Sequence, residues 1–355
     1  MRASLSCLLE EVSRLPRLQQ RKVGCLVGAA VGDAAARPLH WVYDIAALNS
    51  AVKTNPNQPE FWPRSYSPFY SLETGDTSCY WDQAMAVLTA ITDQEFSYQN
   101  ICQELVQQLG PGSAYNMEAR QEFMWRRSQG LSLTPVKGKW LHGGMIKFLE
   151  NFSQGSRICG DPSIKETDGF CCSLPVAVRF AGQPRLVEAV LRVASTQSTW
   201  PVAVRHAVVA ARIVEAFILE REEPILSLAR EIEPEFPEIS REMEQVVASK
   251  TVDHTTAVGQ IFGRPCYNPG SFLGALHAVL SSHSFPEAVR KTILAGGCNC
   301  SRAFFIGQLR LQRGKYFVSN DINLNQVRCL VLNMEWRAFL SIGWRKLKIS
   351  IIFLN

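Results

Sequence analysis

A turn rich in thiols and small polar groups lies late in the chain, within the stretch ILAGGCNCSRAFFIG. Cys298 and Cys300 flank Asn299, Ser301 follows, and helix-forming residues stand on both sides. A thiol near a helix N-terminus has a lowered pKa and reacts as a nucleophile or with oxidants. Cys298 and Cys300 are therefore redox candidates. The plainer interpretation is that both thiols simply fill space in a core.

A zinc site is a second hypothesis for these cysteines, with Asp82 and His40 as further ligands. The C-x-C spacing is a weak zinc signal compared with paired C-x-x-C motifs. Asp82 opens the helical pattern DQAMAVLTAITD, where a carboxylate also serves as a helix cap. His40 is a candidate general base, and with Trp41 it forms either a ligand contact or an aromatic cluster at a helix end.

Three more charged residues are candidates for ligand contacts. Asp33 interrupts the apolar stretch CLVGAAVGDAAA, either as a polar contact near a ligand or as a buried carboxylate that ties helix ends together. Arg302 and Lys291 flank the cysteine turn. They are either phosphate-binding groups or ordinary solvated charges.

The elements that must position these residues are helices, because helical periodicity is strong and strand signals are weak. Roughly a dozen helices with short links predict an all-α bundle. The Ala/Gly-rich stretch around Asp33 predicts a central helix. Ser284, Pro286 and the later glycines are the start and stop signals of a complete helix. Residues 51–78, rich in prolines and aromatics, predict a long loop of the kind that is often functional.

Composition excludes several classes of protein. The 355 residues are 46% hydrophobic and 19% charged, with a formal net charge of +5 that is spread thinly. Without a basic face we expect no nucleic acid as a partner. The longest apolar run is too short for a bilayer, so we expect no membrane either. Eleven cysteines without an export signal predict reduced thiols in the cytoplasm or the nucleus.

Three segments together carry a resemblance to a known family. They are GCLVGAAVGDAAARPLHW, GDTSCYWDQAMAVL and GGCNCSRAFFIG. In this order and at this separation, the chain resembles the ADP-ribosylglycohydrolase family over residues 21–310. RPLHWVYD, SCYWDQ and GGCNCSRA are most similar to its J-type crystallin and selenoprotein J branch. The resemblance implies a single large multi-helix orthogonal bundle, all-α in class.

The resemblance also suggests how the chain is divided. We expect an N-terminal helical extension at residues 1–20 and the ADP-ribosylglycohydrolase-like domain at residues 21–312. Residues 313–355 are expected to form a divergent C-terminal tail, because they gain Asn, Ile, Trp and Lys and lose the Ala/Gly helix signature.

Active members of the family use two magnesium or manganese ions to hold ADP-ribose and to cleave the bond at its anomeric carbon. Two hard dications need several oxygen ligands and enough carboxylate charge. The family pattern Thr-Asp-Asp-Thr falls here on Trp81, Asp82, Gln83 and Ala84. The Asp-Thr-Asp-Thr of the later motif falls on Cys298, Asn299, Cys300 and Ser301, and the family glutamate falls on His40.

One carboxylate, Asp82, and one hydroxyl, Ser301, thus remain at the metal-ligand positions. Thiols are poor ligands for magnesium, and one carboxylate does not offset the hydration of two dications. The sequence therefore predicts a degenerate magnesium site without resident cofactor, in a pseudoenzyme with a binding or crystallin-like structural role. An ADP-ribose-like small molecule is the expected ligand, with contacts from Asp33, Trp41, Gln83, Asn299 and Arg302.

Two other functions are alternatives to this interpretation. The first is an active hydrolase of ADP-ribosyl or related N- or O-glycosidic bonds, with Mg²⁺ as cofactor. It would use Asp82 and His40 as catalytic residues, with Cys300 in a supporting role. The second is a thiol-based redox protein centred on Cys298 and Cys300.

Overall fold

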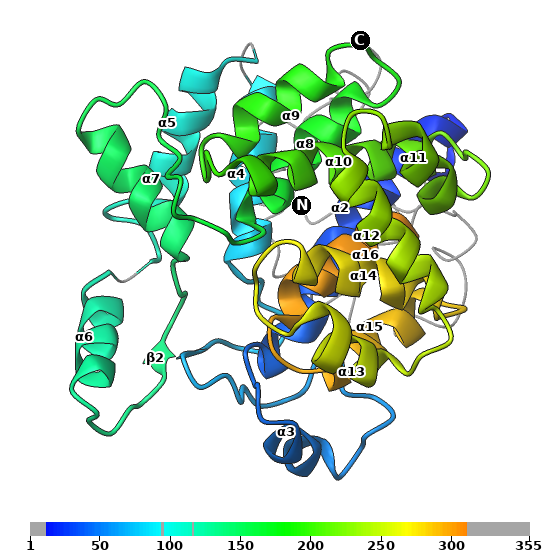
Figure 1. Cartoon of the computed structure of the whole chain (residues 1–355). Helices are drawn as coiled ribbons and strands as arrows, with labels where there is room; N and C mark the ends of the chain where they lie inside the picture. Colours follow the sequence, from blue (N-terminus) through cyan, green and yellow to red (C-terminus); the bar gives the residue numbers. More distant parts are fainter. Residues whose placement is uncertain (1–11, 94–95, 116, 311–355) are drawn as a thin grey trace.

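The computed structural model describes residues 12–93, 96–115 and 117–310. Within these residues the fold is all-α, as predicted, with a single pair of two-residue strands (Figure 1). The expected tail at 313–355 lies outside the described residues, as do the first eleven residues of the expected extension. None of the helices that the structure describes combines the length and the apolar character of a membrane span.

Most helices follow one another with short links, and the longest link runs from α3 to α4. They are α2 (Arg17–Ala36), α3 (Ile45–Val52), α4 (Cys79–Asp93), α5 (Tyr98–Leu109), α6 (Met117–Ser128), α7 (Gly143–Ser153), α8 (Asp168–Phe180), α9 (Leu186–Ala194), α10 (Pro201–Ile218), α11 (Pro224–Ile232), α12 (Pro237–Ala248), α13 (His254–Thr256), α14 (Gly270–Leu280), α15 (Phe285–Leu294) and α16 (Asn299–Arg310). A 3-10 turn, η1 (Arg37–Leu39), follows α2, and a π-helical turn, η2 (Ala257–Phe262), follows α13. Helix α2 begins at Arg17 and runs without a break past residue 20, where the extension was expected to end.

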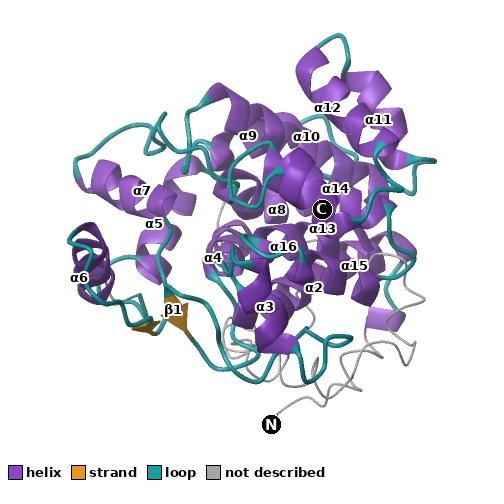
Figure 2. Cartoon of the chain, turned by 60° about the horizontal axis from the view of Figure 1, so that its bottom comes forward, coloured by secondary structure: helices purple, strands orange, loops and turns teal. Residues whose placement is uncertain are grey.

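Helices α2 and α16 lie side by side at the centre of the bundle (Figure 2). Glycines make this close approach of two backbones possible. A Cβ added at Gly32 would lie 2.1 Å from the Ala303 carbonyl oxygen, and one added at Gly307 would lie 1.8 Å from the Gly28 carbonyl oxygen. The predicted central helix around Asp33 is thus confirmed, and its small residues explain why it is central.

A second group of helices covers one side of this pair. Helix α8 packs against α4, α9 and α10, and nearly all of its side chains are buried. Cys171 and Cys172 lie in this helix with no exposed surface, so both are core residues. The buried face of α10 includes Val208 and Ile213.

The long irregular segment predicted at 51–78 is confirmed from residue 53 onward. It contains one short strand, β1 (Tyr70–Ser71), which pairs in parallel with β2 (Val136–Lys137). Backbone amides of Phe61 and Tyr66 donate to carbonyls of Ala35 and Pro38, so the segment is tied to the end of α2. This tie holds the start of α4 close to α2.

The start of one helix near the cysteine turn differs from the prediction. Helix α4 begins at Cys79, where the Ser78 hydroxyl accepts the Tyr80 amide at 3.2 Å, so the expected cap Asp82 is wrong. Helix α16 begins at Asn299, directly after Cys298. The start of α15 is confirmed, because the predicted cap, Ser284, accepts the backbone amide of Glu287.

Candidate functional site

The cysteine turn and the end of α2 are joined by a short antiparallel bridge. Trp41 donates its amide to the Gly297 carbonyl at 2.8 Å, and Gly297 donates back to Val42 at 2.8 Å. Gly296 and Gly297 have φ values of 72° and 67°, and a Cβ on Gly297 would lie 2.5 Å from the Arg264 carbonyl oxygen. Only glycine fits this turn, which brings the first and third predicted segments together.

Asp33 is fully buried near the end of α2 and holds the start of α4. Its carboxylate accepts both the amide and the hydroxyl of Ser78, at 2.6 Å and 2.5 Å. Burial outweighs these two hydrogen bonds and raises the pKa of Asp33 from 3.8 to about 7. The interpretation as a buried carboxylate that ties helix ends together is therefore confirmed.

Replacement of Asp33 by asparagine is expected to flatten the pH dependence of stability. A folded-state pKa raised from 3.8 to about 7 gives stability that is present below pH 3.8 and is lost as pH rises to about 7. In the wild type this loss is on the order of 4 kcal/mol, because one pKa unit corresponds to about 1.4 kcal/mol. Urea unfolding of wild type and variant across this pH range measures the free energy of unfolding. Parallel plots of this free energy against pH for the two proteins would contradict the prediction.

Cys298 lies at the centre of a buried polar cluster. Its sulfur is 3.4 Å from His40 Nε2, 3.1 Å from the Tyr80 hydroxyl and 3.2 Å from the Ser301 hydroxyl. The other imidazole nitrogen of His40 is 2.9 Å from the Tyr70 hydroxyl. The structure thus brings together two predicted site residues, Cys298 and His40, through a direct contact.

This environment changes the acidity of both groups. Burial alone raises the pKa of Cys298, but hydrogen bonds from Cys266, His40 and Ser301 outweigh burial and lower it well below the ordinary thiol value. Burial lowers the pKa of His40. The cluster therefore favours a negative charge on the Cys298 sulfur.

Cys300 has a different environment, although it is only two residues away. Its thiol donates to the Asp33 backbone carbonyl at 3.7 Å, and burial raises its pKa well above the ordinary value. These features favour the space-filling interpretation for Cys300. The zinc hypothesis fails: among the described residues, no group of three or more His, Cys, Asp or Glu side chains has metal-binding geometry, so Cys298, Cys300, Asp82 and His40 do not form one.

Asp82 already has three polar partners. Its carboxylate accepts the hydroxyls of Thr77 at 2.8 Å and Tyr115 at 2.6 Å, and it pairs with the Lys139 ammonium at 2.5 Å. Burial lowers the pKa of Lys139, but the Asp82 carboxylate more than compensates, so this pKa is raised. The Asp82 carboxylate is thus neutralised by a lysine from another part of the chain.

The hydrogen-bond donors of Ser301, Asn299 and Gln83 all contact other groups of the protein. The Ser301 hydroxyl contacts the Ser271 hydroxyl at 2.6 Å. Asn299 Nδ2 donates to the Leu39 carbonyl at 3.0 Å, and Gln83 Nε2 donates to an Asp168 carboxylate oxygen at 2.6 Å. The buried side-chain oxygens of Asn299 and Gln83 have no hydrogen-bond partner among the described residues.

Arg302 is fully buried at the start of α16. Its guanidinium donates to the side chain and carbonyl of Thr292 and to the carbonyls of Gly296 and Arg264. Burial lowers the pKa of Arg302 to about 10. The alternative of a solvated charge is wrong, because the guanidinium holds the cysteine turn from inside. Lys291 pairs with Glu287 on α15.

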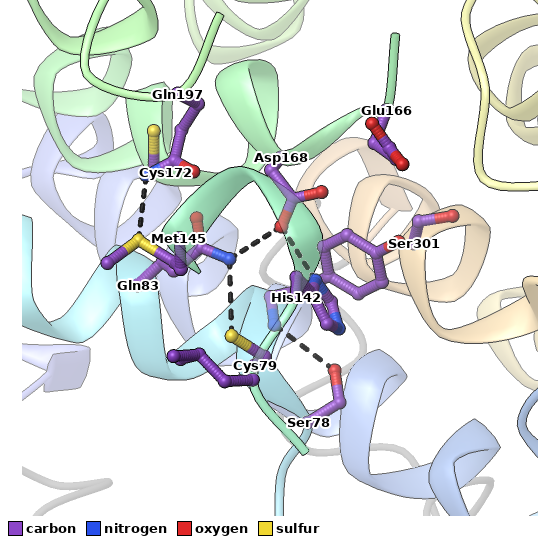
Figure 3. A network of polar contacts seen from close by, with 12 residues as sticks. Ser78, Cys79, Gln83, His142, Met145, Glu166, Asp168, Cys172, Gln197 and Ser301 are labelled. Carbon is purple, nitrogen blue, oxygen red and sulfur yellow. Dashed lines mark hydrogen bonds and ion pairs between the residues drawn. The ribbon is translucent and has the colours of Figure 1, made fainter. Parts of the chain in front are cut away.

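A network centred on Asp168 was not found from the sequence. Figure 3 shows Gln83 and His142 converging on this carboxylate, with His142 Nδ1 at 2.6 Å from Oδ1. Burial lowers the pKa of His142, but the Asp168 charge more than compensates and raises it. The second oxygen of Asp168 has no partner among the described residues. The available signal was an acidic residue in the first turn of α8.

Aromatic rings line the same region. His40 stacks on Trp41 with ring centroids 4.2 Å apart. Trp41 also meets the edges of Tyr70 and Trp140, and Tyr80 meets the edge of His142 at 4.4 Å. The interpretation of His40 and Trp41 as an aromatic cluster at a helix end is confirmed.

A sequence model of the ADP-ribosylglycohydrolase family matches residues 14–310. The chain belongs to the ADP-ribosylglycohydrolase family. Crystallin J1A of Tripedalia cystophora is 28% identical over 295 residues, which are 81% of this chain and 86% of the crystallin. Crystallin J1B of the same organism is 25% identical over 297 residues, which are 82% and 87% of the two chains. The predicted similarity to the crystallin branch is thereby confirmed.

A solved structure described as an ADP-ribosylglycohydrolase-related protein complex has a similar fold. The TM-score is 0.55 at 17% identity, and the match covers 89% of this chain and 97% of that chain. At this identity the likeness concerns the fold alone, and it confirms the predicted helical architecture.

Proposed function

We propose that this member of the ADP-ribosylglycohydrolase family is non-hydrolytic and has a binding or structural role, like that implied by the name of its crystallin relatives. The observation that carries the proposal is the contact between Asp82 and Lys139. In the family pattern the position of Asp82 is a metal ligand, and here a fixed ammonium group occupies its carboxylate.

Charge makes this position unsuitable for two dications. A unit charge pair 4 Å apart interacts by about 4 kcal/mol at an effective dielectric of about 20, and the repulsion between an ammonium and a dication is about twice that. Cys298 and Cys300 stand where the family has two aspartates, and thiols are poor magnesium ligands. The residues present therefore do not fit a dinuclear magnesium centre.

The donor set suits a small polar ligand better than a metal ion. The free oxygens of Asn299 and Gln83 are neutral acceptors for ligand hydroxyls. Trp41 and its aromatic neighbours offer ring faces and edges for a nucleoside-like group. An ADP-ribose-like molecule remains our proposed ligand. Arg302 and Asp33 are not part of this proposal, because other protein groups occupy them.

The alternative of an active hydrolase has less support. A general base needs a free nitrogen or oxygen that reaches the substrate. Both ring nitrogens of His40 have protein partners, and the Asp82 carboxylate has three. We also propose a cytoplasmic location, because the nine cysteines among the described residues are all free thiols.

Magnesium is expected to leave the thermal unfolding of this protein unchanged. A metal bound at one hundred times its dissociation constant would stabilise the fold by about 2.7 kcal/mol, a readily measured shift. Scanning calorimetry with and without magnesium tests this, together with an ADP-ribosyl hydrolysis assay. Calorimetric titration with ADP-ribose is expected to show the same affinity in both conditions.

The variant Asp82→Ala distinguishes a non-hydrolytic protein from an active hydrolase. If the protein is non-hydrolytic, this change leaves the response to magnesium flat and alters stability alone. Magnesium-dependent ADP-ribose binding that disappears in Asp82→Ala would overturn the proposal and favour the hydrolase.

A further inference from the structure

We propose that His254 and His277 form a pH-sensitive latch, which holds residues 254–264 against α14 at neutral pH and releases them in mildly acidic solution. The sequence gave no signal for either histidine. The inference does not depend on ADP-ribose binding, because it concerns two imidazole rings outside the cluster around Cys298.

The latch joins both ends of one short segment to a single side chain of α14. Helix α13 begins at His254 and continues directly into the π-helical turn η2, which ends at Phe262. His254 Nδ1 lies 3.0 Å from His277 Nδ1, and the rings of Phe262 and His277 have centroids 5.7 Å apart. Both histidines are buried. The segment is therefore folded over His277 and contacts it at both ends.

Hydrogen bonds determine where the protons of the two rings lie. His277 Nε2 is 3.0 Å from the Ser249 carbonyl oxygen, which can only accept, so this nitrogen carries a proton. In the neutral ring His277 Nδ1 is then an acceptor, and His254 Nδ1 donates to it. His254 Nε2 keeps a lone pair, and it is buried with no hydrogen-bond partner among the described residues.

A further proton has no favourable position in this pair. On His254 Nε2 it would create a buried imidazolium N–H without an acceptor. On His277 Nδ1 it would place two N–H groups head to head at 3.0 Å. The Ser281 hydroxyl, 3.5 Å from the same nitrogen, is too distant to form a strong hydrogen bond. Protonation therefore breaks the contact between α13 and α14.

The surroundings of the pair set the sign of this effect. Burial lowers the pKa of both histidines from 6.5. Lys291 of α15 lowers both values further and Arg302 of α16 lowers that of His254, whereas Asp253, which caps α13, opposes the change at His277. A lowered histidine pKa gives stability that is complete above about pH 6.5 and is lost as pH falls toward the folded-state value.

Release of this segment would loosen the cysteine turn. Arg264 follows η2, and its backbone carbonyl accepts the Cys298 amide at 2.9 Å. Arg264 Nε donates to the Ala295 carbonyl at 3.0 Å, on the other side of the two turn glycines. The latch thus couples acidity to the geometry of the candidate site.

Hydrogen exchange of the full chain, read by mass spectrometry at about pH 5.5 and about pH 7.5, tests the proposal. At the lower pH a histidine with an ordinary pKa is about ten-to-one protonated, so the population of the open segment should rise about tenfold. After correction for the intrinsic exchange rate, protection of residues 254–264 and of the Cys298 amide should fall by this factor. Protection of α9, which contains no histidine, should stay unchanged.

His254→Gln should flatten this response. The glutamine amide can donate to neutral His277 and can turn to accept from the protonated ring, so the contact survives in acid. His283→Gln is the matched control, because His283 is exposed and lies in the link between α14 and α15. The control should keep the full change in protection.

NMR of the imidazole nitrogens gives a second test in the wild type, which does not require any variant to fold. At neutral pH His254 should carry its proton on Nδ1 and His277 on Nε2. Equal corrected protection at the two pH values, an unchanged response in His254→Gln, or a proton on His254 Nε2 at neutral pH would each overturn the proposal. None of these results depends on the outcome of the ADP-ribose experiments.

Discussion

Gly307→Ala is expected to destabilise the protein by about 3 kcal/mol or more. The new Cβ would lie 1.8 Å from the Gly28 carbonyl oxygen, an atom of the α2 backbone that no side-chain rotation can move. Helices α2 and α16 would have to separate, and forced overpacking typically costs about 1–3 kcal/mol, with higher values where backbones meet. Cys298 immediately precedes α16, so the site would be displaced as well.

Urea denaturation followed by tryptophan fluorescence measures this effect. Gly169→Ala is the matched control, because Gly169 is also buried and helical but its added Cβ meets atoms no closer than 3.7 Å. Alanine is a better helix former than glycine, so the control should be neutral or slightly stabilising. Equal stability of the two variants would show that α2 and α16 do not make the close contact described above.

Replacement of His142 by alanine is expected to destabilise the protein by about 3–5 kcal/mol, the usual cost of removing one partner of a buried ion pair. Asp168 would keep a buried charge with only Gln83 as a hydrogen-bond donor among the described residues. The raised pKa of His142 sets the pH dependence. Stability from a raised histidine pKa is complete below 6.5 and is lost as pH rises through the folded-state value, so the difference between wild type and variant should shrink at alkaline pH.

Chemical denaturation at about pH 6 and about pH 9 tests both parts of this prediction. Lys147→Ala removes one side of an exposed ion pair on the neighbouring helix α7 and should change stability very little. A loss of less than about 1 kcal/mol in His142→Ala at the lower pH would contradict the assignment of a buried ion pair.

Local signals predicted much of the framework. The stretch around Asp33 is a central helix because its small residues allow close packing, and Ser284 caps α15 as its position predicts. Short-range patterns succeed here because a cap and a helical stripe depend on residues within a few positions of one another. The same reasoning misassigned the cap of α4, since two polar residues, Ser78 and Asp82, were both available near its start.

Local signals were less informative about the site. Arg302 had the appearance of a surface charge, but the glycine turn encloses it and supplies carbonyl acceptors. Asp168 and His142 were overlooked because each is ordinary alone. They form a pair only where α8 and the residue before α7 meet.

The sequence by itself determined the family and the helical class. These properties depend on residue identity and on order along the chain. Tertiary structure alone decided that Lys139 neutralises Asp82 and that His40 and Tyr80 contact the Cys298 sulfur. Such pairs join residues tens of positions apart, and no periodicity encodes them. Their chemistry arises from the low-dielectric interior, where a neighbour within hydrogen-bond distance sets charge and reactivity.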